Sequence, residues 1–229
     1  MPVIRILRSR EIGRLFARRT ARLSAAEAVV RPILEAVRRR GDKALLAYAR
    51  KFDGLERKSV KVPERELASA CGKLSAEFRA AIEIASANIR AFAEMQMPAE
   101  QFGEFAPGLR LGQMVRPLDT VAAYIPAGRY PLPSTLMMTV IPAQVAGVRR
   151  VCVACPRPVP EILGTARLLQ VNEVFQMGGA QAIAAFAFGT RTVLVERNWY
   201  LRLQARQPIL RIGPRTAVIW SASAILRTD

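Results

Sequence analysis

The hydrophobic pattern divides the chain into a helical first half and a second half in which strands and helices alternate. The helical period is clearest in residues 75–98, where apolar side chains recur three and four positions apart behind a serine. Residues 24–41 and 42–54 carry the same period, and each segment is closed by a glycine. The sequence from Ser24 to Glu27 is a capping box, which predicts a helix start at this point. We also expect a short strand at residues 59–62, a short helix at 64–71 and a β-hairpin around Gly112.

The second half repeats a strand, a turn rich in proline or glycine, and a helix. Short apolar runs at residues 121–125, 151–154 and 174–177 are typical of buried parallel strands. Ser134 is expected to cap the first of the helices that follow. The strands of such units end at one edge of the sheet, where α/β proteins bind their ligands. The predicted helices span residues 135–146, 161–169 and 180–188.

The predicted fold class is therefore α/β, with a helical N-terminal region and an incomplete Rossmann-like unit that has a short parallel sheet. We divide the chain into four segments. They are a basic helical arm (1–22), a mainly helical first part of an α/β domain (23–118), the Rossmann-like unit (119–194) and an arginine-rich tail of uncertain fold (195–229).

Composition narrows the choice of location and partner. No apolar run reaches the ~20 residues that a membrane span needs, and no apolar stretch of a signal peptide follows the first residues, so we expect a cytoplasmic protein. The net charge of +17 comes from arginines spread over the whole length, with no basic run longer than residues 38–40. Aromatic residues are not interleaved with them, which argues against nucleic acid as a partner. A basic nucleic-acid-associated protein stays open as a third reading of the chain.

Histidine and cysteine usage restricts the chemistry. The chain has no histidine, so it cannot supply an imidazole base or an imidazole metal ligand. The odd number of cysteines, Cys71, Cys152 and Cys155, argues against a disulfide framework. Because Cys152 and Cys155 lie at the end of a predicted strand, three positions apart, we expect buried thiols on opposite faces and not a redox pair.

Four motifs in the second half resemble the histidinol dehydrogenase family. They occur in the family's order and cover long spans, and the helical pattern of residues 24–98 is similar to the family as well. The resemblance therefore extends over roughly residues 1–194. The motifs are Ala123-Tyr124-Ile125-Pro126-Ala127-Gly128, Pro131-Leu132-Pro133-Ser134-Thr135, Ile141-Pro142-Ala143 with Ala146-Gly147-Val148, and Gly178-Gly179-Ala180-Gln181-Ala182-Ile183-Ala184-Ala185.

The resemblance implies an activity and a set of cofactors. The family oxidises L-histidinol through histidinaldehyde to L-histidine, with two NAD molecules and a zinc ion, as an intertwined homodimer. On this basis residues 119–194 are the NAD-binding unit, and Tyr124 and Gln181 occupy the positions that contact NAD. From their spacing alone, a core aromatic for Tyr124 and a helix cap for Gln181 are the favoured readings.

The departures from the family pattern matter equally. Ala127 stands where the family usually has glycine, and the likeness fades after Thr192, so that Asn198 is only a possible remnant of a third NAD contact. The family's zinc ligands and its Glu-His acid–base pair fall in the part that has no match here, and we assign no catalytic or metal-binding residue. We expect a truncated, catalytically incomplete histidinol dehydrogenase that leaves apolar surface open and self-associates. The alternative is a noncatalytic nucleotide-binding or dimerisation module.

Overall fold

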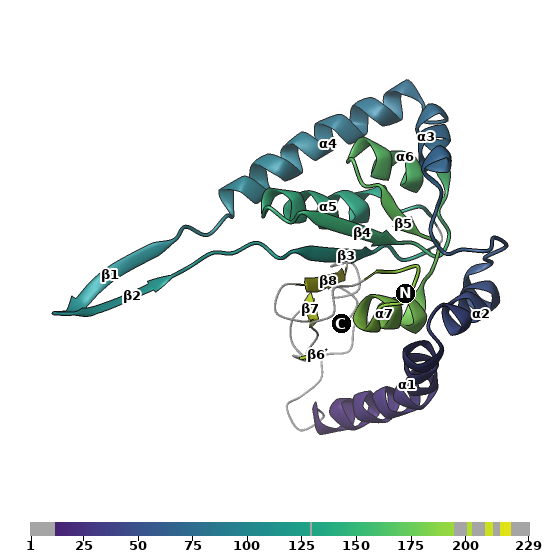
Figure 1. Ribbon diagram of the computed structural model, residues 1–229, viewed down its shortest axis with the longest axis horizontal. Coiled ribbons are helices and arrows are strands. Elements are labelled where there is room, and N and C mark those ends of the chain that lie inside the picture. The colour runs from purple at the N-terminus through teal and green to yellow at the C-terminus, as the bar shows by residue number, and fades with distance from the viewer. Residues whose placement is uncertain (1–11, 129, 195–200, 203–208, 213–215, 221–229) are drawn as a thin grey trace.

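A mixed β-sheet lies at the centre of the molecule (Figure 1). The computed structural model describes residues 12–128, 130–194, 201–202, 209–212 and 216–220, and side chains for 24–128 and 130–194. Within these residues the strand order is β5-β4-β3-β8-β7-β6. The strands β5 (Glu173–Phe175), β4 (Arg150–Ala154), β3 (Thr120–Tyr124) and β8 (Thr216–Trp220) are parallel, and β7 (Ile209–Ile212) and β6 (Leu201–Arg202) continue the sheet in antiparallel pairing. The predicted α/β class with a short parallel sheet is confirmed.

Helices cover both faces of this sheet (Figure 1). The connections from β3 to β4 and from β4 to β5 place two helices on one face, and the chain then crosses to the other face. The first face carries α3 (Glu64–Gly72), α4 (Ala76–Met95), α5 (Pro133–Val145) and α6 (Pro160–Leu168), and the second carries α1 (Ile12–Arg40), α2 (Asp42–Asp53) and α7 (Gly179–Phe188).

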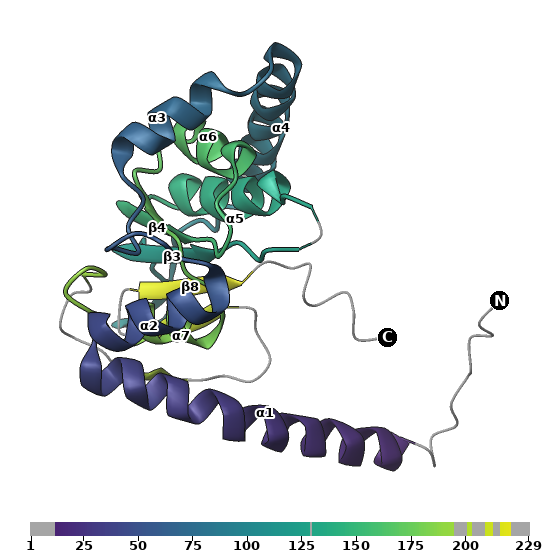
Figure 2. The same ribbon diagram turned by 90° about the vertical axis from the view of Figure 1, so that its right-hand side faces the viewer.

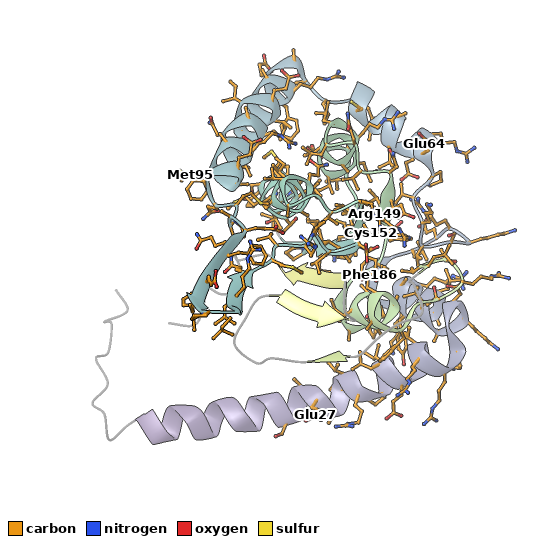
Figure 3. All side chains as sticks on the ribbon, turned by 60° about the vertical axis from the view of Figure 1, so that its left-hand side comes forward. Glu27, Glu64, Met95, Arg149, Cys152 and Phe186 are labelled. Carbon is orange, nitrogen blue, oxygen red and sulfur yellow. The ribbon has the colours of Figure 1, made fainter. Side chains whose placement is uncertain are left out.

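The alternation of side chains along each strand divides the interior into two hydrophobic cores. In β4, Val153 packs with the core under α5 and α6, whereas Cys152 belongs to the core under α7. Phe175 and Phe186 close the second core with an edge-to-face contact at 5.8 Å between ring centroids. In Figure 3 Cys152 and Phe186 are labelled in this region, in the sheet and on α7. A strand buried on both faces reads as a continuous apolar run, which explains why the sequence predicted these strands.

The first helix begins earlier than its capping box predicts. α1 runs without a break from Ile12 through Ser24 to Arg40, and its amino-terminal part extends past the sheet (Figure 2). The residues before Ser24 are mainly arginine, alanine and leucine, which favour a helix and carry it through the capping sequence. The helical character of the predicted N-terminal arm is confirmed for residues 12–22, and residues 1–11 lie outside the described part of the chain.

The next three helices follow the local signals in the sequence. Gly54 adopts the left-handed conformation (φ 64°) that ends α2, and the Ser75 hydroxyl accepts a hydrogen bond from the Phe78 amide at the start of α4. Ile82 is buried on the predicted face of α4, but Phe92 on the same face is 56% exposed. The predicted strand at residues 59–62 is reduced to a single bridge between Lys61 and Phe175.

The β-hairpin is present, but its turn is not at Gly112. β1 (Gln101–Ala106) and β2 (Leu109–Gln113) are joined through Gly108, which has a positive φ of 76°. Gly112 lies within β2 opposite Phe102, and a Cβ atom there would come within 2.2 Å of the Phe102 ring. The glycine thus makes room for an aromatic ring across the hairpin, and the prediction mistook it for a turn.

The second half agrees with the predicted order of elements and differs at their ends. Ser134 is not the cap of α5, because the helix already starts at Pro133, a residue whose fixed φ suits the first helical position. In the tail, the described backbone at residues 216–220 adds β8 beside β3, and Asn198 lies outside the described residues. Across the described helices, none is long and apolar enough to pass through a membrane.

Candidate functional site

The parallel strands β3, β4 and β5 end at a common edge of the sheet, and their exit loops lie together there. The pairing Tyr124 to Ala154 and Ala154 to Phe175 aligns the last residues of the three strands. Each strand is followed by residues that turn the chain sharply, Pro126, Pro156 and Gly178. The described chain thus builds a ligand-binding edge of the kind expected for an open α/β sheet.

Tyr124 joins the exit of β3 to the exit of β5. Its half-buried ring packs against the core under α7, and its hydroxyl accepts a hydrogen bond from the Gly179 amide at 3.3 Å. Burial raises the pKa of the phenol above its usual value, partly offset by this hydrogen bond. Tyr124 therefore stays neutral at ordinary pH.

Gln181 lies in the first turn of α7 and points inward. Only 2% of the residue is exposed, and its side-chain nitrogen donates to the Asp53 carboxylate at 2.9 Å. The same carboxylate oxygen accepts the Gly178 amide at 2.9 Å. The structure thus brings Tyr124 and Gln181 together around the Gly178-Gly179 turn, and it adds a carboxylate from the end of α2.

Asp53 is the residue at this site that sequence reasoning missed. It is 8% exposed, and burial raises the pKa of its carboxyl, against the opposing effects of the hydrogen bonds from Gln181 and Gly178 and of the Arg157 charge. One signal was available: Asp53 is the last residue of α2, where the helix dipole disfavours a negative charge. A buried carboxylate in that place indicates partners outside its own helix.

Both glycines of the turn are required by their surroundings. At Gly178 a Cβ atom would lie 2.7 Å from Cβ of Pro156 and 3.0 Å from Oδ1 of Asp53. Gly179 has a φ of 54°, which side-chain-bearing residues rarely adopt. The turn is therefore shaped by close packing at its first position and by backbone conformation at its second.

A cleft of about 210 Å³ opens beside this network, between the exits of β3 and β4. Its walls are mostly apolar, and Arg157 brings a positive charge to them. Tyr130, which is 73% exposed, also lines this cleft. An apolar cleft with one cation suits a flat ring that carries an anionic group. The lining residues are Pro126, Ala127, Gly128, Tyr130, Pro131, Leu132, Cys155, Arg157, Val159 and Ile162.

The thiols near this edge are buried, as the sequence predicted. Cys152 and Cys155 are each 2% exposed and belong to the cores on opposite faces of the sheet. Burial raises the pKa of Cys152 to about 12 and that of Cys155 to about 11. Because the thiolate is the reactive form, neither residue suits redox chemistry or metal binding in this fold.

The two implied cofactors, zinc and NAD, differ in how well the described residues suit them. In the described part of the chain no group of three or more histidine, cysteine, aspartate or glutamate residues is placed to hold a metal ion, and the sequence has no histidine, so zinc does not fit these residues. The cleft and its Arg157 cation are compatible with a ring and a phosphate of a dinucleotide. These features define an open α/β protein whose candidate site lies at the carboxyl edge of its parallel strands.

Comparisons with known proteins identify the family. The family model described as histidinol dehydrogenase matches residues 16–195. A histidinol dehydrogenase of Symbiobacterium thermophilum is 47% identical over 183 residues, which are 77% of this chain and 42% of the relative. The chain belongs to the histidinol dehydrogenase family.

Further relatives agree. A histidinol dehydrogenase of Methanosarcina mazei is 42% identical over 189 residues, or 80% of this chain and 43% of the relative. The crystal structure of histidinol dehydrogenase from Elizabethkingia anophelis superimposes with a TM-score of 0.69 at 33% identity, over 73% of this chain and 40% of that one. The chain thus spans about two fifths of the length of these proteins.

Proposed function

We propose that this chain carries an NAD-binding part of a histidinol dehydrogenase, an oxidoreductase of histidine biosynthesis. The observation that carries the proposal is the joining of two strand exits by the Tyr124 hydroxyl and the Gly179 amide, next to the cleft at the exits of β3 and β4. Relatives bearing the name histidinol dehydrogenase align with this segment. NAD, when bound, supplies the acceptor for a hydride taken from an alcohol carbon.

Three residues of the chain are assigned to different parts of the bound NAD. Tyr124 offers a ring face at the end of β3, which suits packing against a dinucleotide. Arg157 lies in the cleft wall and suits a phosphate group. Gln181 would act at the inner end of the site, where its amide is held by Asp53.

The remaining parts of the activity lie beyond these residues. Zinc finds no ligand set among them, and proton transfer by an imidazole has no candidate in the sequence. We therefore propose that this chain alone binds NAD without oxidising histidinol. Homodimer formation and a cytoplasmic location complete the proposal, as the family resemblance suggests.

Calorimetric titration of the purified chain with NAD tests the binding proposal. The double variant Tyr124→Ala, Gln181→Ala removes a ring contact and a hydrogen-bonding amide, so we expect its affinity to fall at least tenfold, on the scale of about 1.4 kcal/mol or more. Unchanged affinity in this variant would contradict the assigned site.

A matched control removes the same residue types elsewhere. Tyr48 stacks on Phe52 within α2, and the Gln144 side chain donates to the Leu169 carbonyl oxygen at 2.7 Å beyond the other end of the strands. The variant Tyr48→Ala, Gln144→Ala should lose stability but keep the NAD affinity of the folded protein. Formation of NADH from histidinol by the unmodified chain would overturn the view that it lacks the catalytic groups.

A further inference from the structure

The Asp53 carboxylate ties α2 to the turn between β5 and α7 through a single oxygen atom. Its Oδ2 accepts hydrogen bonds from the Gly178 amide and from Nε2 of Gln181, both at 2.9 Å. Its partners are 125 and 128 positions away in the sequence. Asp53 is neither exposed nor part of the cleft wall, so it acts on this edge only through the two groups that it holds.

An ionised carboxylate determines which way round the Gln181 amide lies. A carboxylate only accepts hydrogen bonds, so the amide nitrogen of Gln181 must face Asp53 and the amide oxygen must face the other way. That oxygen, Oε1, lies 3.0 Å from where a Cβ atom of Gly179 would stand. Within the described residues Oε1 has no hydrogen-bond partner, and it does not count among fully buried atoms. The edge beside Gly179 thus presents an acceptor without a donor.

We propose that Asp53 is the positioning residue of the nucleotide site: it holds the Gly178-Gly179 turn and orients Gln181 so that the carbonyl oxygen of Gln181 faces the cofactor. This inference rests on the proposed function and specifies which kind of hydrogen-bonding group of NAD meets Gln181. The group of NAD that meets Gln181 is a hydrogen-bond donor, an N–H or O–H. Burial raises the pKa of Asp53, and the hydrogen bonds from Gln181 and Gly178, followed by the charge of Arg157, oppose that rise and favour the ionised carboxylate.

Exchanging the two side chains tests the orientation. Gln181→Glu alone sets two carboxylates against each other, so NAD affinity should fall about tenfold or more, the loss expected when a hydrogen bond to a charged group is replaced by repulsion. The double variant Asp53→Asn, Gln181→Glu reverses donor and acceptor. Both native hydrogen bonds end on Oδ2, so the amide nitrogen of the new asparagine can take that place and donate to the glutamate, while the Gly178 amide loses its acceptor. The glutamate still presents an oxygen to the cofactor, so part of the lost affinity should return.

A merely structural role for Asp53 predicts a different pattern. The double variant would then bind NAD no better than Gln181→Glu, and this result would overturn the proposal. Asp42 provides the matched control, because it is also a carboxylate of α2 and accepts hydrogen bonds from the Thr192 amide at 3.0 Å and the Thr192 hydroxyl at 2.9 Å. Asp42→Ala should lower stability as Asp53→Ala does, yet leave the NAD affinity within about twofold, since the two sites share no partners.

Hydrogen exchange followed by mass spectrometry tests the positioning role of Asp53 in the absence of NAD. In Asp53→Ala, peptides covering residues 176–184 should exchange at least tenfold faster while the rest of α2 and the sheet keep their protection; Asp42→Ala should leave this segment unchanged. Unaltered exchange at 176–184 in Asp53→Ala would refute the positioning role. If no variant and not even the unmodified chain binds NAD, the proposed function fails, and the exchange measurement alone decides whether Asp53 holds the turn.

Discussion

The chemistry of individual side chains in this fold is set by which face of the sheet they reach. Cys152 and Cys155 are close in the sequence, yet each is enclosed by a different core. The two thiols therefore cannot meet, and burial keeps both protonated, with pKa values raised to about 12 and about 11. A motif that often signals redox activity is here a consequence of strand periodicity.

Thiol labelling checks this interpretation. Only Cys71 is partly accessible, so Ellman's reagent should modify one thiol quickly in the native protein and all three in denaturant. In Cys71→Ser the fast reaction should disappear. Rapid labelling of this variant under native conditions would show that Cys152 or Cys155 is open to solvent.

Residue identity also explains what the sequence could predict about the site. Tyr124 and Gln181 lie next to prolines and glycines that mark strand exits, so their neighbourhood is visible in a single stretch of sequence. Asp53 is followed by Gly54, which marks a helix end and not a strand exit, and its partners are more than a hundred positions away. A contact of that kind follows from tertiary packing and leaves only an indirect trace, a carboxylate at the wrong end of a helix.

Elements were predicted well where their signals are local. Gly54 and Ser75 ended and began their helices as expected, because a left-handed glycine and a capping hydroxyl act on the adjacent backbone alone. The capping box at Ser24 failed since the residues before it also favour a helix. Gly112 was misread because the ring that it accommodates, Phe102, belongs to the opposite strand. Boundaries that depend on a second element could not be derived from the sequence.

The neighbouring strands β4 and β5 are joined by a charged cluster whose effect depends on pH. Arg150 donates to Glu173 through Nε at 2.5 Å and through a terminal nitrogen at 3.1 Å, and the Cys152 thiol donates to the same carboxylate. Burial alone would raise the pKa of Glu173, but these hydrogen bonds and the charges of Arg150 and Lys61 hold it below the ordinary value of 4.5. A depressed carboxyl pKa stabilises the fold above 4.5, and this stabilisation is lost as the pH falls through the folded-state pKa.

Urea unfolding at a series of pH values tests the sign. Glu173→Gln should lower the free energy of unfolding by about 1 kcal/mol at neutral pH, the scale of a partly exposed ion pair. The difference from the unmodified protein should shrink as the solution becomes more acidic than pH 4.5. A difference that stays constant over the whole pH range would show that the charge of Glu173 has no part in it.

At the scale of the whole molecule, the hairpin of β1 and β2 stands away from the rest of the fold (Figure 1). A hairpin of two strands is marginally stable by itself in water, and this one is exposed along nearly all of its length. Its exposed apolar side chains form a surface that water disfavours. They are Phe102, Phe105, Leu109 and Leu111, with Met114 just beyond β2.

We expect the chain to self-associate through this hairpin. Dynamic light scattering should show species larger than a monomer, and Phe105→Glu with Leu111→Lys should shift the distribution toward the monomer by reducing the apolar area. Val29→Glu serves as the control, because Val29 is also an exposed apolar residue, 68% exposed, but lies on α1. A clean monomer for the unmodified chain, or equal effects of the two changes, would contradict the assignment to the hairpin.

The two carboxylates at the ends of α2 have a consequence for how the protein is made. Asp42 is bound to Thr192 and Asp53 to Gly178, so this early helix is secured at both ends by residues synthesised much later. During translation, α2 must leave the ribosome and wait, with Leu45 and Ala49 unburied, until more than a hundred further residues have emerged. Closure of such distant contacts is slow, which makes the nascent first half of this chain a natural client for molecular chaperones.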